Sequence, residues 1–327
     1  MAPAAIPGAE VPWHLLRPSE DFGSLLEDPA AMAALEELPG ELAVLSLVGS
    51  QRGGKSTLMN LLHGRSTRGF PVGHHLDAKT SGLWVWPRPH PRREGTTVLL
   101  VDSEGLDSPH VPRHYHWLLS ALTLLSSDVF MFQSRGCIDQ SQSERLDVLL
   151  RIAEQLGRES GAGGPAGTFL WLIRDHQLQL RHTPVEELHE KLEPAALDGL
   201  RRCFGQTDCM LLPRPAHADE QLRSMEQLAY EDLTPEFREE YALLERRLFD
   251  ALARPRNVLG APLTGRTLVA CLRGYLRALR EGPGLLRELR QLPSQGELLA
   301  RLAGERAVEA AVAAYERAMA AARPAGE

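Results

Sequence analysis

The feature of the sequence that most limits its fold is a glycine-rich loop between an apolar run and a helix-forming segment. Residues 42–48 read LAVLSLV, a compact run that predicts a buried parallel strand. The loop GSQRGGKS follows over residues 49–56, and the segment TLMNLL after it has helical character. A strand, a G-x-x-x-x-G-K-S loop and a helix in this order form a phosphate-binding unit, because main-chain N–H groups curl around an anion at the positive end of the helix.

Further apolar runs predict additional buried strands, and helix-forming stretches lie between them. The predicted strands are residues 96–101, 128–132, 168–173 and 208–212, and the predicted helices between them include 114–125 and 143–156. Alternating strands and helices predict an α/β fold. We therefore expect a P-loop NTPase with a mostly parallel sheet, covered by helices on both faces, plus a C-terminal helical flank.

The segments on either side of this core differ from it in composition. Residues 1–37 are rich in Pro, Ala, Glu and Asp, and predict a loose lead-in with short helical turns. Residues 38–254 hold the predicted core. Residues 255–327 contain helix formers interrupted by prolines and no strand run, so they predict a helical flank that completes the domain and begins a stalk that is truncated or absent.

Composition excludes several classes of function. The net charge is −7, so no general basic field attracts nucleic acid or anionic lipid. No apolar run is long enough for a transmembrane segment, and the ends of the chain show neither a secretory signal nor a prenylation cysteine. The cysteines fit neither a zinc site nor a disulfide scaffold, which favours a reducing, cytoplasmic location. They are Cys137, Cys203, Cys209 and Cys271.

The polar residues of the loop and of a second strand predict a metal–phosphate site. Lys55 would place a positive charge at the β- and γ-phosphates, and Ser56 would offer its hydroxyl to Mg²⁺. Asp102 follows the strand at 96–101 and would hold the same Mg²⁺ through water, while the N–H of Gly105 would sense the γ-phosphate. The predicted nucleotide-binding residues of the loop are Gly49, Ser50, Gln51, Arg52, Gly53, Gly54, Lys55, Ser56 and Thr57.

The sequence specifies which nucleotide base is bound less clearly than it specifies how the phosphates are bound. The common Asn/Thr-Lys-x-Asp guanine signature is absent, and Arg174-Asp175 follows the strand at 168–173 instead. A carboxylate there would accept from N1–H and the exocyclic amine of guanine, whereas adenine presents neither donor on that edge. An isolated Arg-Asp pair also occurs as a surface salt bridge.

Together the motifs resemble, in order and approximate spacing, the GTPase domain of the guanylate-binding protein and atlastin branch of the dynamin superfamily. The resemblance covers about residues 38–320 and is closer to the guanylate-binding side over residues 80–86. The segments that carry it are QRGGKS (51–56), GFP (69–71), KTSGLWVW (79–86), DSEGL (102–106), WLIRD (171–175), CMLLPRP (209–215) and LTPEF (233–237).

The resemblance implies roles for individual residues of these segments. Arg52 would be an arginine finger that turns onto the phosphates when two domains meet face to face. Thr80 would be the switch threonine that completes the Mg²⁺ shell, and Glu104 would help to orient the attacking water. Arg174 with Asp175 would read guanine. Residues near Arg214 would belong to a guanine cap that forms part of the dimer surface.

The implied activity is Mg²⁺-dependent hydrolysis of GTP to GDP and phosphate, coupled to nucleotide-dependent homodimerisation. One position departs from the pattern, because Ala78 stands where some relatives carry a serine that helps to pass on the proton of the attacking water. A GTP-gated interaction module with little hydrolysis is therefore an alternative. An ATPase is another, since the common guanine signature is missing.

Overall fold

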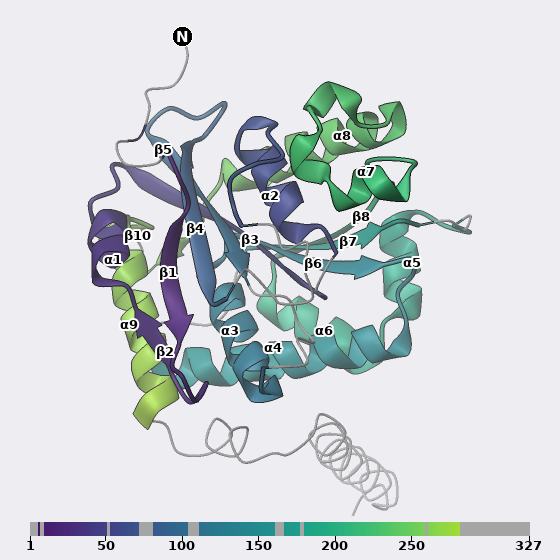
Figure 1. Cartoon of the computed structure of the whole chain (residues 1–327). Coiled ribbons are helices and arrows are strands. Elements are labelled where there is room, and N and C mark those ends of the chain that lie inside the picture. Colours follow the sequence, from purple (N-terminus) through teal and green to yellow (C-terminus); the bar gives the residue numbers. More distant parts are fainter. Residues whose placement is uncertain are drawn as a thin grey trace, which may run out of the picture. The chain divides into compact units, whose positions relative to one another are not determined.

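An eight-stranded sheet runs through the centre of the structure in the order β2-β1-β4-β5-β3-β6-β7-β8 (Figure 1). Neighbouring strands from β5 to β8 in this order are parallel, and β4, β1 and β2 are antiparallel to their neighbours. The predicted mostly parallel sheet is confirmed. The strands are β1 Trp13–Pro18, β2 Leu25–Glu27, β3 Glu41–Gly49, β4 Leu83–Pro89, β5 Thr96–Ser103, β6 Val129–Arg135, β7 Thr168–Arg174 and β8 Gln206–Leu212.

The computed structural model describes residues 6, 10–50, 53–71, 81–103, 111–160, 167–176, 180–258 and 261–281. All of them belong to one compact unit. Residues 282–327, the later part of the predicted helical flank, lie outside the described residues.

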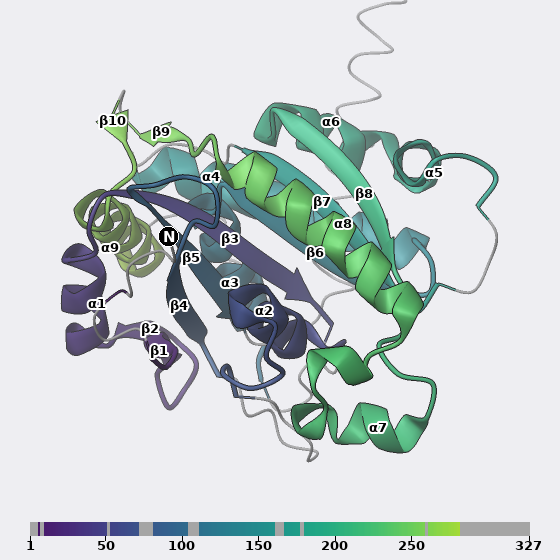
Figure 2. The ribbon, with the colours of Figure 1, turned by 90° about the horizontal axis from the view of Figure 1, so that it is seen from above.

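Helices lie on both faces of the sheet, as predicted for an α/β fold (Figures 1 and 2). Helices α2 and α8 cover one face, where they share a core with alternate residues of β3, and α3, α4 and α6 lie on the other. The α-helices are α1 Pro29–Glu36, α2 Lys55–Gly64, α3 Arg113–Ser126, α4 Gln140–Ser160, α5 Pro184–Lys191, α6 Pro194–Cys203, α7 Asp219–Arg223, α8 Pro235–Leu252 and α9 Gly265–Glu281. Short elements complete the described residues, namely the 3-10 turns Met225–Gln227 and Tyr230–Asp232 and the paired strands β9 Asn257–Val258 and β10 Ala261–Pro262.

The expectation of a loose lead-in is wrong for the segments that form β1 and β2. Strand β1 pairs with β4 and extends the sheet, with His14 opposite Trp84. The register shifts between His14 and Leu16, so both Leu15 and Leu16 are buried. A bulge of this kind removes the alternation of apolar and polar residues that would have revealed a strand in the sequence.

The segment predicted as a helical flank begins with the paired strands β9 and β10, which the sequence analysis did not predict, and continues as helix α9. Helix α9 packs against α1, α3 and α4, so the first part of the flank completes the same unit as the sheet. Among the described residues, no helix combines the length and the apolar character needed to cross a lipid bilayer.

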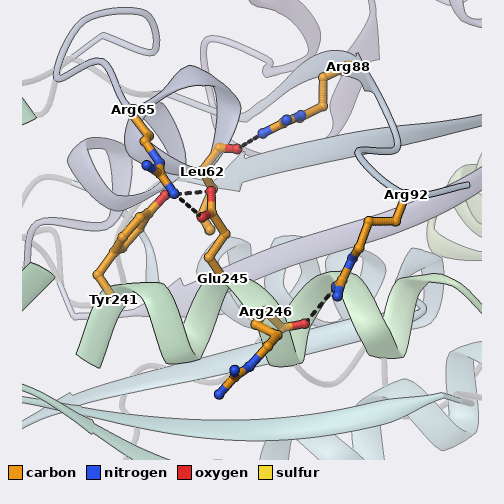
Figure 3. Close-up of polar contacts among 7 residues, drawn as sticks. All are labelled: Leu62, Arg65, Arg88, Arg92, Tyr241, Glu245 and Arg246. Atoms are coloured by element: carbon orange, nitrogen blue, oxygen red, sulfur yellow. Dashed lines mark hydrogen bonds and ion pairs between the residues drawn. The ribbon is translucent and has the colours of Figure 1, made fainter. Parts of the chain in front are cut away.

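Polar contacts fasten α8 to the end of α2 and to the segment that follows β4. Nη2 of Arg65, directly after α2, donates to Oε2 of Glu245 at 3.0 Å, and the hydroxyl of Tyr241 contacts the other oxygen of Glu245. The guanidinium of Arg88 donates to the carbonyl oxygen of Leu62. The α2 helix is therefore held at its C-terminal end by side chains from two other elements. Figure 3 shows these contacts among Leu62, Arg65, Arg88, Arg92, Tyr241, Glu245 and Arg246.

Candidate functional site

The glycine-rich loop lies at the carboxyl edge of the parallel strands, between β3 and α2. Strand β3 ends at Gly49 and helix α2 begins at Lys55. Gly54 precedes the helix with φ of +76°, a left-handed conformation that glycine adopts without a Cβ penalty. No described side chain caps this end of α2. Its first N–H groups and the positive end of its dipole are therefore available to an anion, as the motif predicted.

Two glycines of the loop are required by a close approach to strand β6. A Cβ on Gly49 would lie 2.5 Å from the carbonyl oxygen of Gln133, and a Cβ on Gly53 would overlap Nε2 of the same residue. At Gly49 the obstacle is backbone, so a side chain there would require the strand to shift, whereas at Gly53 it is the end of the Gln133 side chain, which would have to move away. The glycines predicted from the motif thus serve the packing of the loop on β6 as well as its curvature.

Lys55 folds back over the loop that it is predicted to complete. Its ammonium Nζ donates to the carbonyl oxygen of Ser50 at 3.0 Å, and the residue is 6% exposed. This position keeps the charge within the loop, where a bound phosphate would meet it.

Ser56 and Asp102 come together as the sequence predicted for a metal site. The Ser56 hydroxyl donates to Oδ2 of Asp102 at 2.6 Å. Burial raises the pKa of the Asp102 carboxyl to about 6, although the Ser56 hydrogen bond and the charge of Lys55 act in the opposite direction. The other oxygen, Oδ1, is buried and has no hydrogen-bond partner within the part of the chain that the structure describes.

This donor set fits a hard divalent cation. A hydroxyl and a carboxylate are the oxygen ligands that Mg²⁺ takes in proteins, directly or through water. Oδ1 of Asp102, which has no hydrogen-bond partner within the described residues, could accept from a metal-bound water. Ser56 and Asp102 are therefore able to hold Mg²⁺ beside the loop.

Arg174 and Asp175 are adjacent in the sequence, but their side chains lie in two different places. The Arg174 guanidinium is buried behind the loop, with Nη1 at 3.6 Å from the position of a Cβ on Gly54 and with Cζ 5.9 Å from the centre of the Phe237 ring. Burial lowers the pKa of Arg174 to about 10, partly offset by the charge of Asp175. Arg174 thus lies against the phosphate loop rather than beside its neighbour's carboxylate.

Asp175 occupies the edge of the sheet where the base was expected. It has a left-handed backbone with φ of 55°, and its N–H donates to the carbonyl oxygen of Leu212 at 3.2 Å. Its side chain is 17% exposed, and Oδ2 pairs with Nε of Arg135 at 3.0 Å. The carboxylate is therefore accessible and already held by a cation at the end of β6.

Several predicted residues lie outside the described residues. They are Gln51, Arg52, Ala78, Thr80, Glu104 and Gly105. The remaining loop residue, Thr57, is buried in the first turn of α2.

Two residues that the sequence analysis missed brace the site. Asn60 in α2 accepts from the N–H of Phe70 at 2.6 Å and donates to the carbonyl oxygens of Thr67 and Phe70, so it ties the Gly-Phe-Pro segment to the loop helix. Gln133 donates from Nε2 to the carbonyl oxygen of Gly53 at 2.8 Å. A signal for Gln133 was present, because it is the first polar residue after the apolar run at 128–132.

Comparisons with known proteins agree with the motifs. A sequence model described as "Guanylate-binding protein, N-terminal domain" matches residues 23–255. Guanylate-binding protein 2 of Rattus norvegicus is 29% identical over 342 aligned residues, which cover 94% of this chain and 56% of that protein. Guanylate-binding protein 1 of Homo sapiens is 28% identical over 329 aligned residues, which cover 91% of this chain and 54% of that protein. The chain thus spans about half the length of the curated relatives it matches.

Among solved structures, a dimerisation-deficient mutant of Toc33 from Arabidopsis thaliana matches with a TM-score of 0.40 and 12% sequence identity. The match covers 67% of this chain and 87% of that one.

Proposed function

The chain belongs to the guanylate-binding protein family, and we propose that it binds GTP with Mg²⁺ and hydrolyses it to GDP and phosphate, coupled to nucleotide-dependent homodimerisation. The observation that carries this proposal is the Ser56–Asp102 hydrogen bond beside an uncapped helix N-terminus. A hydroxyl, a buried carboxylate and a lysine ammonium at the end of a glycine loop form a binding site for a metal-bound triphosphate.

Each described residue has a separate task in this proposal. The N–H groups of Gly53, Gly54 and Lys55 hold the β-phosphate, and the Lys55 ammonium leaves the Ser50 carbonyl to contact the β- and γ-phosphates. Ser56 and Asp102 would hold Mg²⁺, Asp102 through water. When bound, Mg²⁺ neutralises charge on the β- and γ-phosphates. Stabilisation of charge that spreads over the transferred group is the main source of catalysis in phosphoryl transfer.

Guanine recognition is assigned to Asp175. Its carboxylate accepts from N1–H and the exocyclic amine of guanine, and adenine would leave a partly buried charge without a partner. Arg174 supports the phosphate loop from behind instead of contacting the base.

The residues outside the described part of the chain complete the proposal through the family resemblance. Thr80 would help to hold Mg²⁺, Glu104 would orient the attacking water, and Arg52 would neutralise charge on the γ-phosphate. Because Arg52 is positioned when two domains meet, we expect the specific activity to increase with protein concentration. A turnover that stays constant over a hundredfold dilution would contradict the role of the dimer.

Nucleotide binding is tested by fluorescence titration with labelled GDP and GTP. Lys55→Ala should weaken binding by on the order of tenfold or more, because a charge-assisted contact to phosphate is lost. Lys191→Ala provides a matched control, because Lys191 lies on α5 with an exposed side chain paired to Glu187. Equal affinities for the Lys55→Ala protein and the unaltered chain would refute the site. Competition by ATP as strong as that by GDP would refute the choice of guanine.

The GTP-gated module remains a second candidate, favoured by Ala78 in place of a hydroxyl residue. Rapid mixing of excess protein with GTP, followed by phosphate detection, distinguishes the GTP hydrolase from the GTP-gated module. Release of one phosphate per bound GTP within seconds to minutes supports hydrolysis. Stable GTP in a dimer, measured by light scattering, supports the module.

A further inference from the structure

Gln133 lies near the end of strand β6, directly beside the phosphate loop. It pairs in register with Gly49, the last residue of β3, and it is only 4% exposed. Its Nε2 donates to the carbonyl oxygen of Gly53 at 2.8 Å. Its Oε1 is buried and has no hydrogen-bond partner among the described residues, so the contact with Gly53 is the polar contact that fixes this side chain.

The bond to Gly53 determines how one peptide group of the loop is turned. In a trans peptide, the carbonyl oxygen and the N–H of the next residue point in opposite directions. The Gly53 carbonyl points to Gln133, at the edge of the sheet. The N–H of Gly54 therefore points away from the sheet, on the side of the loop where an anion binds at the helix N-terminus.

The alternative orientation of this peptide would be harmful to the proposed site. A carbonyl oxygen turned into the loop would face the phosphate with its negative end. Gly54 has a left-handed backbone and no Cβ, and Gly53 has none either, so the chain itself resists such a rotation only weakly. A donor held in place from outside the loop is needed to select one orientation.

We propose that Gln133 is a positioning residue for the β-phosphate: it holds the Gly53–Gly54 peptide so that the Gly54 N–H is presented to the nucleotide. This inference rests on the proposed function of the loop. It predicts a difference among nucleotides, because GDP has a β-phosphate and GMP does not. Loss of Gln133 should reduce the affinity for GDP and leave that for GMP unchanged.

The test compares two substitutions at Gln133 with one elsewhere. Gln133→Met keeps the length of the side chain without a donor. Gln133→Glu removes the donor and adds a negative charge beside the loop. Gln206→Glu is the matched control, because Gln206 is exposed at the start of β8, at the opposite edge of the sheet. Thermal unfolding without nucleotide verifies that each protein is folded, and if one Gln133 variant is unfolded the other decides the test.

Affinities for GDP and GMP are measured by displacement of a fluorescent guanine nucleotide. We expect Gln133→Met to weaken GDP binding by on the order of tenfold, because the Gly53 carbonyl loses its donor and its peptide can turn. Gln133→Glu should weaken it further, and Gln206→Glu should match the unaltered chain. The affinity for GMP should change by less than about twofold in every variant, within the scatter expected of surface changes.

Three results would separate a failure of the proposed function from a failure of the positioning role. If the unaltered chain does not bind GDP, the proposed function fails. If it binds GDP and Gln133→Met binds equally well, the positioning role is wrong and the proposed function stands. If both Gln133 variants lose GDP and GMP affinity in parallel, Gln133 only maintains the general structure of the site, and the positioning role is again wrong.

Discussion

Replacing Asp102 with asparagine should stabilise the nucleotide-free protein while weakening its binding of Mg²⁺ and GTP. Asparagine has the same shape and retains an oxygen that can accept from the Ser56 hydroxyl, so the packing is preserved. The substitution removes a buried negative charge. In the metal-free protein that charge is compensated only in part by Ser56 and Lys55, as the raised pKa of Asp102 shows.

The magnitude follows from this pKa. It is raised from 3.8 to about 6, and each unit corresponds to about 1.4 kcal/mol, so the charge costs the folded state up to about 3 kcal/mol at neutral pH. The folded-state pKa lies above the unfolded value. Asp102 therefore contributes its full stability below pH 3.8, and that contribution is lost as the pH rises through about 6. The advantage of the Asp102→Asn protein should accordingly be largest above about pH 7 and fall to roughly half at pH 5.

The assay is urea unfolding of both proteins with nucleotide and divalent metal removed, at about pH 7.5 and pH 5. Asp198→Asn serves as the control, because Asp198 is exposed and paired with Arg201, and its effect should stay below about 1 kcal/mol. Titration with GTP and Mg²⁺ then measures the opposite effect on binding. The reasoning is refuted if Asp102→Asn is as stable as, or less stable than, the unaltered chain at pH 7.5.

Three further predictions concern the loop and its supports. Gly53→Ala should reduce the nucleotide-induced increase in melting temperature, because a Cβ there displaces Nε2 of Gln133 from the Gly53 carbonyl; an unchanged increase would contradict the close approach. Asp128→Ala should lower the free energy of unfolding in urea by about 3 kcal/mol, since its carboxylate accepts from the N–H groups of Val44 at 2.6 Å and Arg256 at 2.7 Å. Arg65→Ala should lower it by less than about 1 kcal/mol, because the Arg65 side chain of the ion pair with Glu245 is 55% exposed, and a larger loss would reveal a stronger coupling of α2 to α8.

The central framework was predictable because buried parallel strands leave continuous apolar runs. The runs at 42–48, 96–101 and 168–173 lie within β3, β5 and β7. Strands β1 and β2 left no such signal, since they lie at the edge of the sheet and are three to six residues long. Their stability comes from strand pairing, of β1 with β4 and of β2 with β1, which is a property of the folded chain rather than of the local sequence.

The site was predictable where its residues are contiguous and not where they support the loop from a distance. The loop from Gly49 to Ser56 is one motif, and its spacing carries its geometry. Gln133 contacts Gly53 across 80 residues of sequence, so only the order of the strands brings them together. Asp102 could be predicted, because an acidic residue at the end of an apolar run is a recognisable sequence pattern.

The charged residues beside the loop suit a nucleotide-bound site better than an empty one. Burial raises the pKa of Asp102 and lowers that of Arg174, so each charge is disfavoured in the nucleotide-free fold. Both lie against the same loop, Asp102 through Ser56 and Arg174 behind Gly54. In the proposed site a metal cation would stabilise the first, and a phosphate anion at the positive end of α2 would stabilise the second. Two opposite charges that are costly in isolation would then become favourable together with a metal-bound phosphate between them.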